Sequence, residues 1–163
     1  MSAISAKLHF VARSRIAASA DALFRWHAEP GALERLTPPW DPIEVVTRSP
    51  GIRDGERGAI RVPFGPFRLL WVFEHRDYIE GRQFRDVQLS GPFRRWEHTH
   101  RFTPDGVDAC ILEDQIDYEL PLGALGSFFA GSFIHRKLEK LFAHRHKITA
   151  EAMATGQAAR TLE

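Results

Sequence analysis

The chain has 163 residues, of which 44% are hydrophobic and 26% are charged, and its formal net charge at pH 7 is +1. This is the composition of an ordinary globular protein, and the length suffices for a sizeable core, so we expect one domain over residues 1–163. The small net charge gives no reason to expect a nucleic-acid partner. Cys110 is the only cysteine, which excludes an internal disulfide and fits a reducing compartment.

Membrane and export signals are not evident in the sequence. The N-terminus lacks the uninterrupted apolar stretch of a signal peptide. The longest uncharged and mostly apolar run, taken over residues 122–134, is shorter than the roughly 20 residues that cross a bilayer. These observations predict a cytoplasmic protein without a transmembrane segment. The tail over residues 155–163 is predicted to be frayed.

The first predicted elements are a strand and two short helices. Apolar and polar residues alternate from Leu8 to Ile16, as in a strand with one buried face. Ser19 can cap a helix that ends at Pro30, and a shorter helix over residues 32–36 stops before a pair of prolines.

About six strands and a long helix are predicted to follow. Turn signals separate strand-like segments at residues 43–47, 59–64, 67–78, 83–89, 95–102 and 109–120. Such short connections favour antiparallel pairing. Apolar residues then recur with a helical period from Leu125 to Met153, which predicts the longest helix of the chain. This order predicts an α+β fold in which a curved antiparallel sheet of about six to seven strands wraps around that C-terminal helix.

One face of the predicted sheet mixes aromatic, aliphatic and ionisable side chains. Period-two alternation puts several histidines and aspartates on the same side as the apolar residues. Each of these groups costs free energy if it is buried without a partner. We therefore predict a ligand cavity between this face and the long helix. Its predicted lining is Trp71, Phe73, His75, Phe84, Asp86, Gln88, Trp96, His98, His100, Phe102, Leu112, Asp114, Ile116, Phe129, Phe133 and Leu138.

Two other interpretations of these polar residues stay open. They could form a purely structural network, or they could carry chemistry. His98 and His100 lie on one side of a strand and, with Asp86 or Asp114, could form a two-histidine, one-carboxylate metal site. A histidine oriented by an aspartate could also act as an acid or base, which makes His98, His100 and Asp114 the catalytic candidates. The spacing fixes neither role, so no metal, cofactor or catalytic residue is assigned.

The outer face of the predicted C-terminal helix carries a basic stripe. This stripe consists of Arg136, Lys137, Lys140, His144 and Lys147. Cations near a helix C-terminus suit the helix dipole, so a solvated face is expected. A transient contact with an anionic membrane surface is the alternative.

Three segments stand out beside the element order: Leu36-Thr-Pro-Pro-Trp40, Gly91-Pro-Phe93 followed by Trp96-x-His98-x-His100-x-Phe102, and Asp114-x-Ile116-x-Tyr118-x-Leu120-Pro121-x-Gly123. The order and these segments resemble, over nearly the whole chain, proteins of the SRPBCC superfamily, which includes START domains and birch-pollen-allergen-like proteins. Together these segments are similar to a bacterial subgroup of ligand-binding SRPBCC proteins. The resemblance implies a helix-grip fold with a deep hydrophobic cavity between the sheet and the C-terminal helix. It transfers no catalytic residue to this chain.

Three hypotheses on function follow. The first is binding of a hydrophobic or amphipathic small molecule, such as a lipid, a polyketide or a quinone-like compound, in the cavity. The second is an enzyme of the cyclase or dehydratase type that uses a cavity histidine and aspartate as acid and base. The third is a protein-interaction module that acts through residues 122–134 or the basic stripe. We expect binding rather than catalysis, and either a monomer or a dimer.

Overall fold

The computed structural model describes residues 7–121 and 123–156, except for the side chains of residues 123–127 and Phe129. Most of the predicted frayed tail, residues 157–163, therefore lies outside the described residues. The described part forms seven strands and three helices, which are β1 (Leu8–Ile16), α1 (Ala20–Ala28), α2 (Ala32–Arg35), β2 (Glu44–Thr47), β3 (Arg57–Phe64), β4 (Phe67–Ile79), β5 (Gln83–Ser90), β6 (Arg95–Pro104), β7 (Cys110–Glu119) and α3 (Gly123–Ala154).

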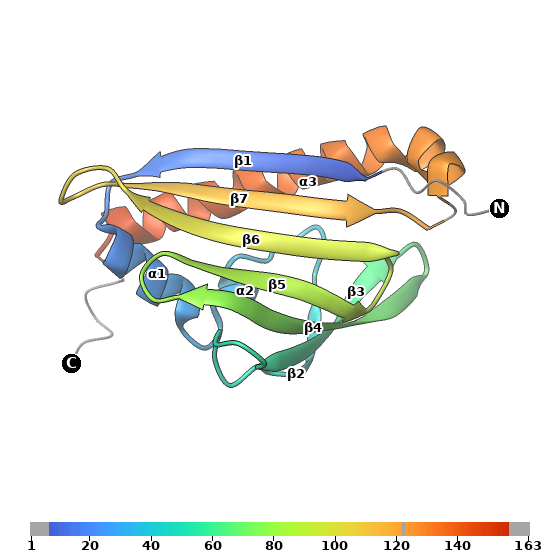
Figure 1. The fold of residues 1–163 in the computed structure, drawn as a ribbon, viewed down its shortest axis with the longest axis horizontal. Helices are drawn as coiled ribbons and strands as arrows, with labels where there is room; N and C mark the ends of the chain where they lie inside the picture. The colour runs from blue at the N-terminus through green and yellow to red at the C-terminus, as the bar shows by residue number, and fades with distance from the viewer. Residues whose placement is uncertain (1–6, 122, 157–163) are drawn as a thin grey trace.

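The strands form one antiparallel sheet in the order β1-β7-β6-β5-β4-β3-β2. The sheet is curved and open, α3 runs along the strands at the β1–β7 end, and the short helices α1 and α2 lie beside the other part (Figure 1). This confirms the α+β helix-grip arrangement, and the strand bounds agree with the predicted ones within two residues. In the described part of the chain, no helix is long and apolar enough to cross a membrane.

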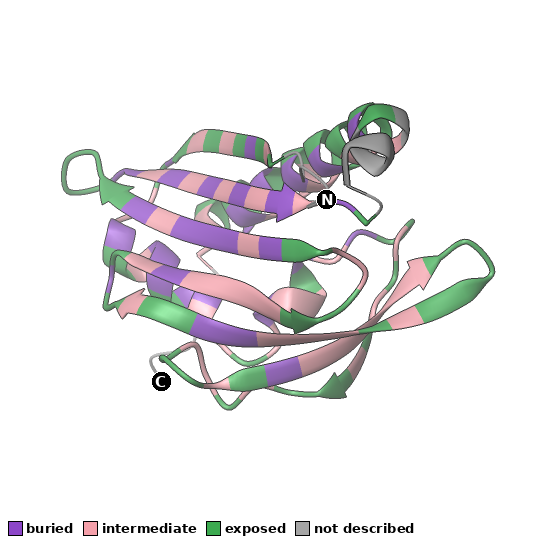
Figure 2. Ribbon diagram, turned by 45° about the vertical axis from the view of Figure 1, so that its right-hand side comes forward, coloured by how far each residue is buried: buried purple, intermediate pink, exposed green. Residues whose placement is uncertain are grey.

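Local sequence explains where these elements begin and end. The Ser19 side chain accepts a hydrogen bond from the backbone N–H of Ala22 at 3.2 Å and so caps α1. Gly31 adopts φ +85° just before α2, a left-handed conformation that glycine tolerates. Along β7 buried and partly exposed residues alternate strictly, and Figure 2 shows such banding as purple and pink stripes on the strands.

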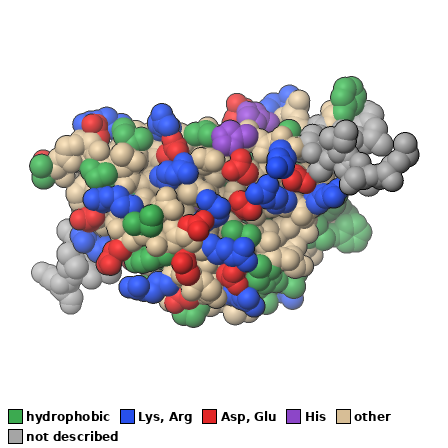
Figure 3. All heavy atoms as spheres, viewed as in Figure 1, with side chains coloured by type: hydrophobic (Ala, Val, Ile, Leu, Met, Phe, Trp, Pro, Cys, Tyr) green, Lys and Arg blue, Asp and Glu red, His purple; other side chains and the backbone are tan. Residues whose placement is uncertain are grey.

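The face of the sheet that points away from α3 carries paired charges. Arg13 and Arg101 both donate hydrogen bonds to Glu113, and Arg95 donates to Glu97 at 2.9 Å. Figure 3 shows this face as intermixed basic and acidic side chains. Exposed ion pairs of this kind contribute little to stability, so the fold depends on the other face.

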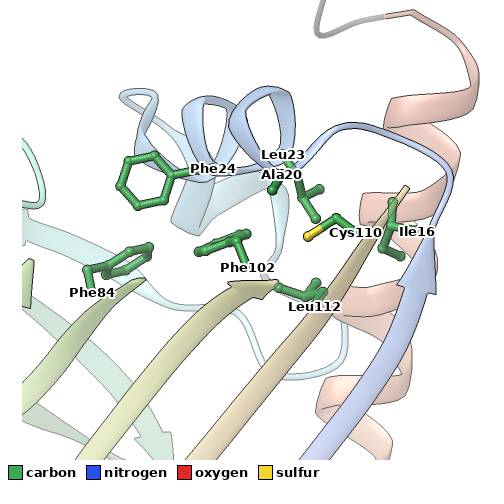
Figure 4. Packing of buried hydrophobic residues seen from close by; sticks show 8 residues of the cluster. All are labelled: Ile16, Ala20, Leu23, Phe24, Phe84, Phe102, Cys110 and Leu112. Carbon is green, nitrogen blue, oxygen red and sulfur yellow. The ribbon is translucent and has the colours of Figure 1, made fainter. Parts of the chain in front are cut away.

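Two hydrophobic clusters fill most of the inner face. The α1 core contains Ile16, Ala20, Leu23, Phe24, Phe84, Phe102, Cys110 and Leu112, and Figure 4 shows its packing under α1. The α3 core contains Phe10, Trp96, Ile116, Tyr118, Leu120, Leu138 and Phe142. Both clusters use residues of β6 and β7, so these central strands are covered on the inner face by packed side chains.

Candidate functional site

A cavity of about 130 Å³ lies between strands β3–β6 and the covering segments α1–α2, β2 and α3. One part of its wall is apolar and is built from Ala32, Leu33, Leu36, Val45, Ile52, Ile60, Phe73 and Phe84. Other lining residues are ionisable, namely His27, His75, Asp86, His100 and Arg145, and the ring of Phe84 stacks on that of His100. An apolar cavity with a few converging polar groups is the usual form of a small-molecule site.

Strand register brings the ionisable groups together. His75 pairs with Asp86 between β4 and β5, and His100 pairs with Asp114 between β6 and β7. Asp86 in turn pairs with His98 between β5 and β6. Residues directly opposite each other in antiparallel strands lie close enough for their side chains to interact. The cluster thus follows from the alternation that the sequence already displays.

His100 lies between two carboxylates. Its Nε2 is 3.2 Å from Asp86 Oδ2, and its Nδ1 is 2.9 Å from Asp114 Oδ1. Burial alone would lower the pKa of His100, but the hydrogen bonds to Asp114 and Asp86 outweigh burial and raise this pKa to about 9. The imidazole is therefore a cation at pH 7. Its charge stands in the cavity wall, stacked on the ring of Phe84.

Both aspartates are held in the ionised form. Burial would raise the pKa of Asp86, but hydrogen bonds from His100 and His75 bring it below its ordinary value. Burial acts in the same direction on the pKa of Asp114, yet its hydrogen bonds with His100, His146 and His98 hold that pKa well below the usual range. His75 Nδ1 lies 2.6 Å from Asp86 Oδ1. Charge-assisted hydrogen bonds of this kind are stronger than neutral ones.

A chain of hydrogen bonds runs from His100 in the cavity through Asp114 and His146 to Ser14. Asp114 Oδ1 is 2.6 Å from His98 Nε2, and Asp114 Oδ2 is 2.7 Å from His146 Nε2. His146 Nδ1 is in turn 2.7 Å from the Ser14 hydroxyl. Ser14 and His146 also line an open groove of about 570 Å³ between β1 and α3. Successive groups connect this groove with His100 in the cavity.

Two further histidines are buried as neutral groups. Burial lowers the pKa of His27 to about 4, and the contact of its Nδ1 with the Leu23 carbonyl at 2.9 Å only partly opposes this. Burial and the nearby positive charge of His100 lower the pKa of His98 to about 4, against the opposing effect of Asp114. Neither imidazole carries a charge at pH 7, so His100 differs from both of them.

Asp86, His98 and His100 could also hold a metal ion. In the described part of the chain their ligand atoms all lie within 4.8 Å of one another. Two histidines and one carboxylate are a known ligand set for transition metals. However, Asp86 and His100 are hydrogen-bonded to each other, and His98 is bonded to Asp114. In the present geometry, the ligand atoms of these residues are engaged in hydrogen bonds instead of pointing at a common metal position.

The structure separates the predicted lining residues into groups. Phe73, His75, Phe84, Asp86 and His100 line the cavity, and whether they bind a ligand stays a prediction. His98 and Asp114 lie behind His100 in the network. Trp71, Trp96, Phe102, Leu112, Ile116 and Leu138 belong to the packed cores or pack against them.

Three predicted lining residues remain. Gln88 donates a hydrogen bond to the carbonyl of Phe93 and so holds the bend between β5 and β6. Phe133 is 55% exposed on α3. The side chain of Phe129 lies outside the described residues. Alternation and helical period show which face is apolar, but they do not distinguish a cavity wall from a packed core.

Several polar residues of the site were not predicted, among them Ser14, His27, Arg145 and His146. A signal existed for two of these four, because His146 follows Phe142 by four residues and Arg145 follows Leu141 by four. Positions at this spacing share the inner face of a helix. No comparable signal marks Ser14 or His27.

The basic stripe of α3 has local partners. Lys137 is 3.6 Å from an oxygen of Asp41, and Lys140 lies over the ring of Trp40 at 4.3 Å. Lys147 is 3.8 Å from Glu151 one turn later. These contacts suit a solvated face, while contact with a membrane surface stays a prediction.

Known proteins share this fold. The model of the polyketide cyclase / dehydrase and lipid transport family matches residues 16–143. Norcoclaurine synthase from Thalictrum flavum in complex with dopamine and hydroxybenzaldehyde is 16% identical, with a TM-score of 0.68 over 92% of this chain and 88% of that chain. A START superfamily protein from Mycobacterium smegmatis is 14% identical, with a TM-score of 0.65 over 90% and 97%.

A third similar structure is the Zhui aromatase/cyclase from Streptomyces sp. R1128. It is 17% identical, with a TM-score of 0.63 over 97% of each chain. At these identities the likeness concerns the fold alone. A comparison with curated protein sequences found no significant match.

Proposed function

Since the chain belongs to the polyketide cyclase / dehydrase and lipid transport family of the SRPBCC superfamily, we propose that it binds a small hydrophobic or amphipathic molecule in the cavity. Membership indicates ligand binding or cyclase-type chemistry in general. The observation that carries the proposal is the mixed lining of the cavity. Phe73 and Ile60 supply apolar surface, and His75, Asp86 and His100 supply ionisable groups. An amphipathic ligand satisfies both kinds of group at once.

The volume limits what the cavity encloses. An engineered protein cavity of about 150 Å³ holds one benzene molecule. A space of about 130 Å³ therefore has room for roughly one aromatic ring or a short aliphatic group. A lipid, a polyketide or a quinone-like molecule would place only one end inside. The ligand's polar end would face His100, and the rest would extend out of the cavity.

Binding is tested with a matched pair of variants on β2. Val45 lines the cavity, whereas Val46 is 43% exposed and does not line it. Native mass spectrometry of the purified protein and titration with a lipophilic fluorescent dye should show one bound molecule. Val45→Phe should fill the cavity and abolish binding, and Val46→Phe should leave it unchanged. Equal dye binding by the wild type and both variants would refute the proposal.

A second candidate function is acid–base catalysis of the cyclase or dehydratase type. The specific observation in its favour is that His100 is a buried cation in the cavity wall, held between Asp86 and Asp114. Such a group can donate a proton to a carbonyl oxygen while Asp86, an ionised carboxylate of the same cavity lining, takes the proton from the α-carbon. The chain through His146 to Ser14 offers a route by which the proton returns from the groove.

Enolisation of a simple ketone tests this candidate. Acetophenone in D2O exchanges its methyl protons slowly, and NMR follows the loss of their signal. The wild type should accelerate the exchange, and His100→Gln should reduce that acceleration by about 100-fold or more. His98→Gln should reduce it less, because His98 does not line the cavity. Acceleration that survives both replacements would eliminate the acid–base role.

Other expectations from the sequence keep their status as predictions. The cytoplasmic location, the single domain, the monomeric or dimeric state and the interaction through residues 122–134 have no observation in their favour beyond the sequence. Residues 123–127 of that segment lack described side chains.

A further inference from the structure

Arg145 lies on α3 and lines the cavity, and its cation lacks a hydrogen-bonded counter-charge. Its Nε is buried and has no hydrogen-bond partner, and its guanidinium carbon lies 5.3 Å from the ring centre of Phe142. Across the described residues, no hydrogen bond or ion pair of the Arg145 side chain is present. The arginines of the outer sheet face behave differently, since Arg13, Arg95 and Arg101 each bind a carboxylate.

The charge of Arg145 persists despite its surroundings. Burial lowers the pKa of its guanidinium, and Asp114 and Asp86 oppose this from beyond contact distance. A guanidinium is nevertheless not deprotonated in proteins, so a cation stands at this position. A buried charge without a hydrogen-bonded partner is unfavourable, and native proteins rarely retain one without use.

The carboxylates that face the cavity are already engaged. Asp86 binds His75 and His100. Two further acidic residues line the cavity: Glu29 accepts a hydrogen bond from Arg35, and Glu34 binds Arg48. Asp114 lies behind His100 and contacts three histidines. The described residues therefore offer Arg145 no free counter-charge, although Arg145 is one of the residues that line the cavity.

We propose that Arg145 binds an anionic oxygen group of the ligand, and that the ligand class is a small organic carboxylate of about one ring in size. The inference rests on the proposed function and makes it more specific. The planar guanidinium matches a carboxylate in a two-point contact. The ring of such a ligand would pack on Phe73 and Phe84, and the cationic His100 would add a second favourable charge.

Benzoate and benzamide distinguish binding in the cavity from recognition of an anionic group by Arg145. They have nearly the same shape, but only benzoate is charged. Titration calorimetry with the wild type should give one site that binds benzoate roughly ten-fold or more tightly than benzamide. Arg145→Gln should remove this preference and keep the binding of benzamide. Arg136→Gln, at an exposed arginine of the same helix, should keep the preference.

The possible outcomes separate the hypotheses. If benzamide binds but benzoate has no advantage, or if the advantage survives in Arg145→Gln, the role of Arg145 is refuted and the cavity remains a binding site. If neither compound binds and no dye enters, the proposed function fails. A measurement without ligand adds a second check. Arg145→Met should raise the melting temperature because it removes an unpaired buried cation, and a lowered melting temperature would contradict the inference.

Discussion

The α3 core and the cavity lie on the same face of one sheet, yet one is filled and the other is open. In the α3 core, rings pack against each other, with centroids of Trp96 and Tyr118 6.0 Å apart and those of Phe10 and Phe142 5.5 Å apart. Around the cavity, the sheet curves away from α3 and short segments cover it instead (Figures 1 and 2). The cavity therefore lies where α1, α2 and the neighbouring loops cover the sheet, and the packed core lies where α3 covers it.

The histidine–aspartate network stands at the boundary between these two regions. Asp114 and His98 are on the side of the α3 core, where the ring of His98 lies 5.2 Å from that of Phe142. Asp86 and His75 are on the side of the cavity. His100 contacts both aspartates and so connects the regions. Substitutions on either side should consequently have different effects on stability and binding.

The largest difference should appear when a phenylalanine is truncated in each region. Phe142 is 2% exposed in the α3 core, so Phe142→Ala should destabilise the protein by about 3–5 kcal/mol. Phe73 forms a partly exposed cavity wall, so Phe73→Ala should cost only about 1–2 kcal/mol and mainly alter dye binding. Urea unfolding measures both values. Similar losses at the two positions would show that the cavity region is as tightly packed as the core.

Removing the charge of Asp114 should be the next largest effect. Asp114→Asn leaves three histidines without their carboxylate, and we expect a loss of roughly 3 kcal/mol in urea unfolding. It should also lower the pKa of His100, which NMR titration of the imidazole protons detects. Asp117→Asn is the matched control on the exposed face, where Asp117 pairs with His9, and it should cost less than about 1 kcal/mol. Equal losses of unfolding free energy in Asp114→Asn and Asp117→Asn would argue against a stabilising role of the histidine–aspartate network.

A smaller effect is expected at Gly58, which lets β3 approach the cavity wall. A Cβ at this position would lie 2.4 Å from Cζ of Phe73, so Gly58→Ala should push that ring aside. We expect a loss of about 1–3 kcal/mol and weaker dye binding. At Gly131 on α3 the added Cβ would meet Leu8 at an ordinary 3.8 Å. Gly131→Ala should therefore be neutral or slightly stabilising, and unchanged dye binding by both variants would contradict the wall position of Phe73.

Much of the fold could be predicted because its signals are local. Glycine and proline turns separate the strands, and the strict alternation of β7 identifies Asp114 as an inner residue. The long helix is visible from the period of Leu138 and Phe142. The inner-face histidines and aspartates were identified by the same alternation, before any contact was known.

The distinction between core and cavity could not be predicted in this way. Trp96 and Phe73 have the same pattern in the sequence, but only Phe73 lines the cavity, because the covering element differs. Arg145 was not predicted either, because its charge beside the basic stripe outweighed the helical spacing from Leu141 that places it on the inner face. It lines the cavity together with residues of α1 and α2, which are far from it in the sequence.

Per pH unit and per histidine, the dependence of the free energy of unfolding on pH should be the smallest of these effects. His27 and His98 have pKa values near 4 in the folded protein, below the ordinary 6.5, so stability should fall as the pH drops from 6.5 towards 4. His100 has a raised pKa of about 9, so its contribution is complete below pH 6.5 and is lost as the pH rises through 9. Each group changes the free energy of unfolding by at most about 1.4 kcal/mol per pH unit. Stability should therefore be highest near pH 6.5.

The two limbs of this pH profile depend on different histidines and can be separated. His100→Gln should abolish the alkaline decline and leave most of the acid decline, because Gln does not titrate. His9→Gln, at an exposed histidine of β1, should preserve both limbs. Urea unfolding between pH 4 and pH 9.5 measures the profiles. An alkaline decline that persists in His100→Gln would mean that another group carries it, and the cation at the boundary between core and cavity would then have to be assigned elsewhere.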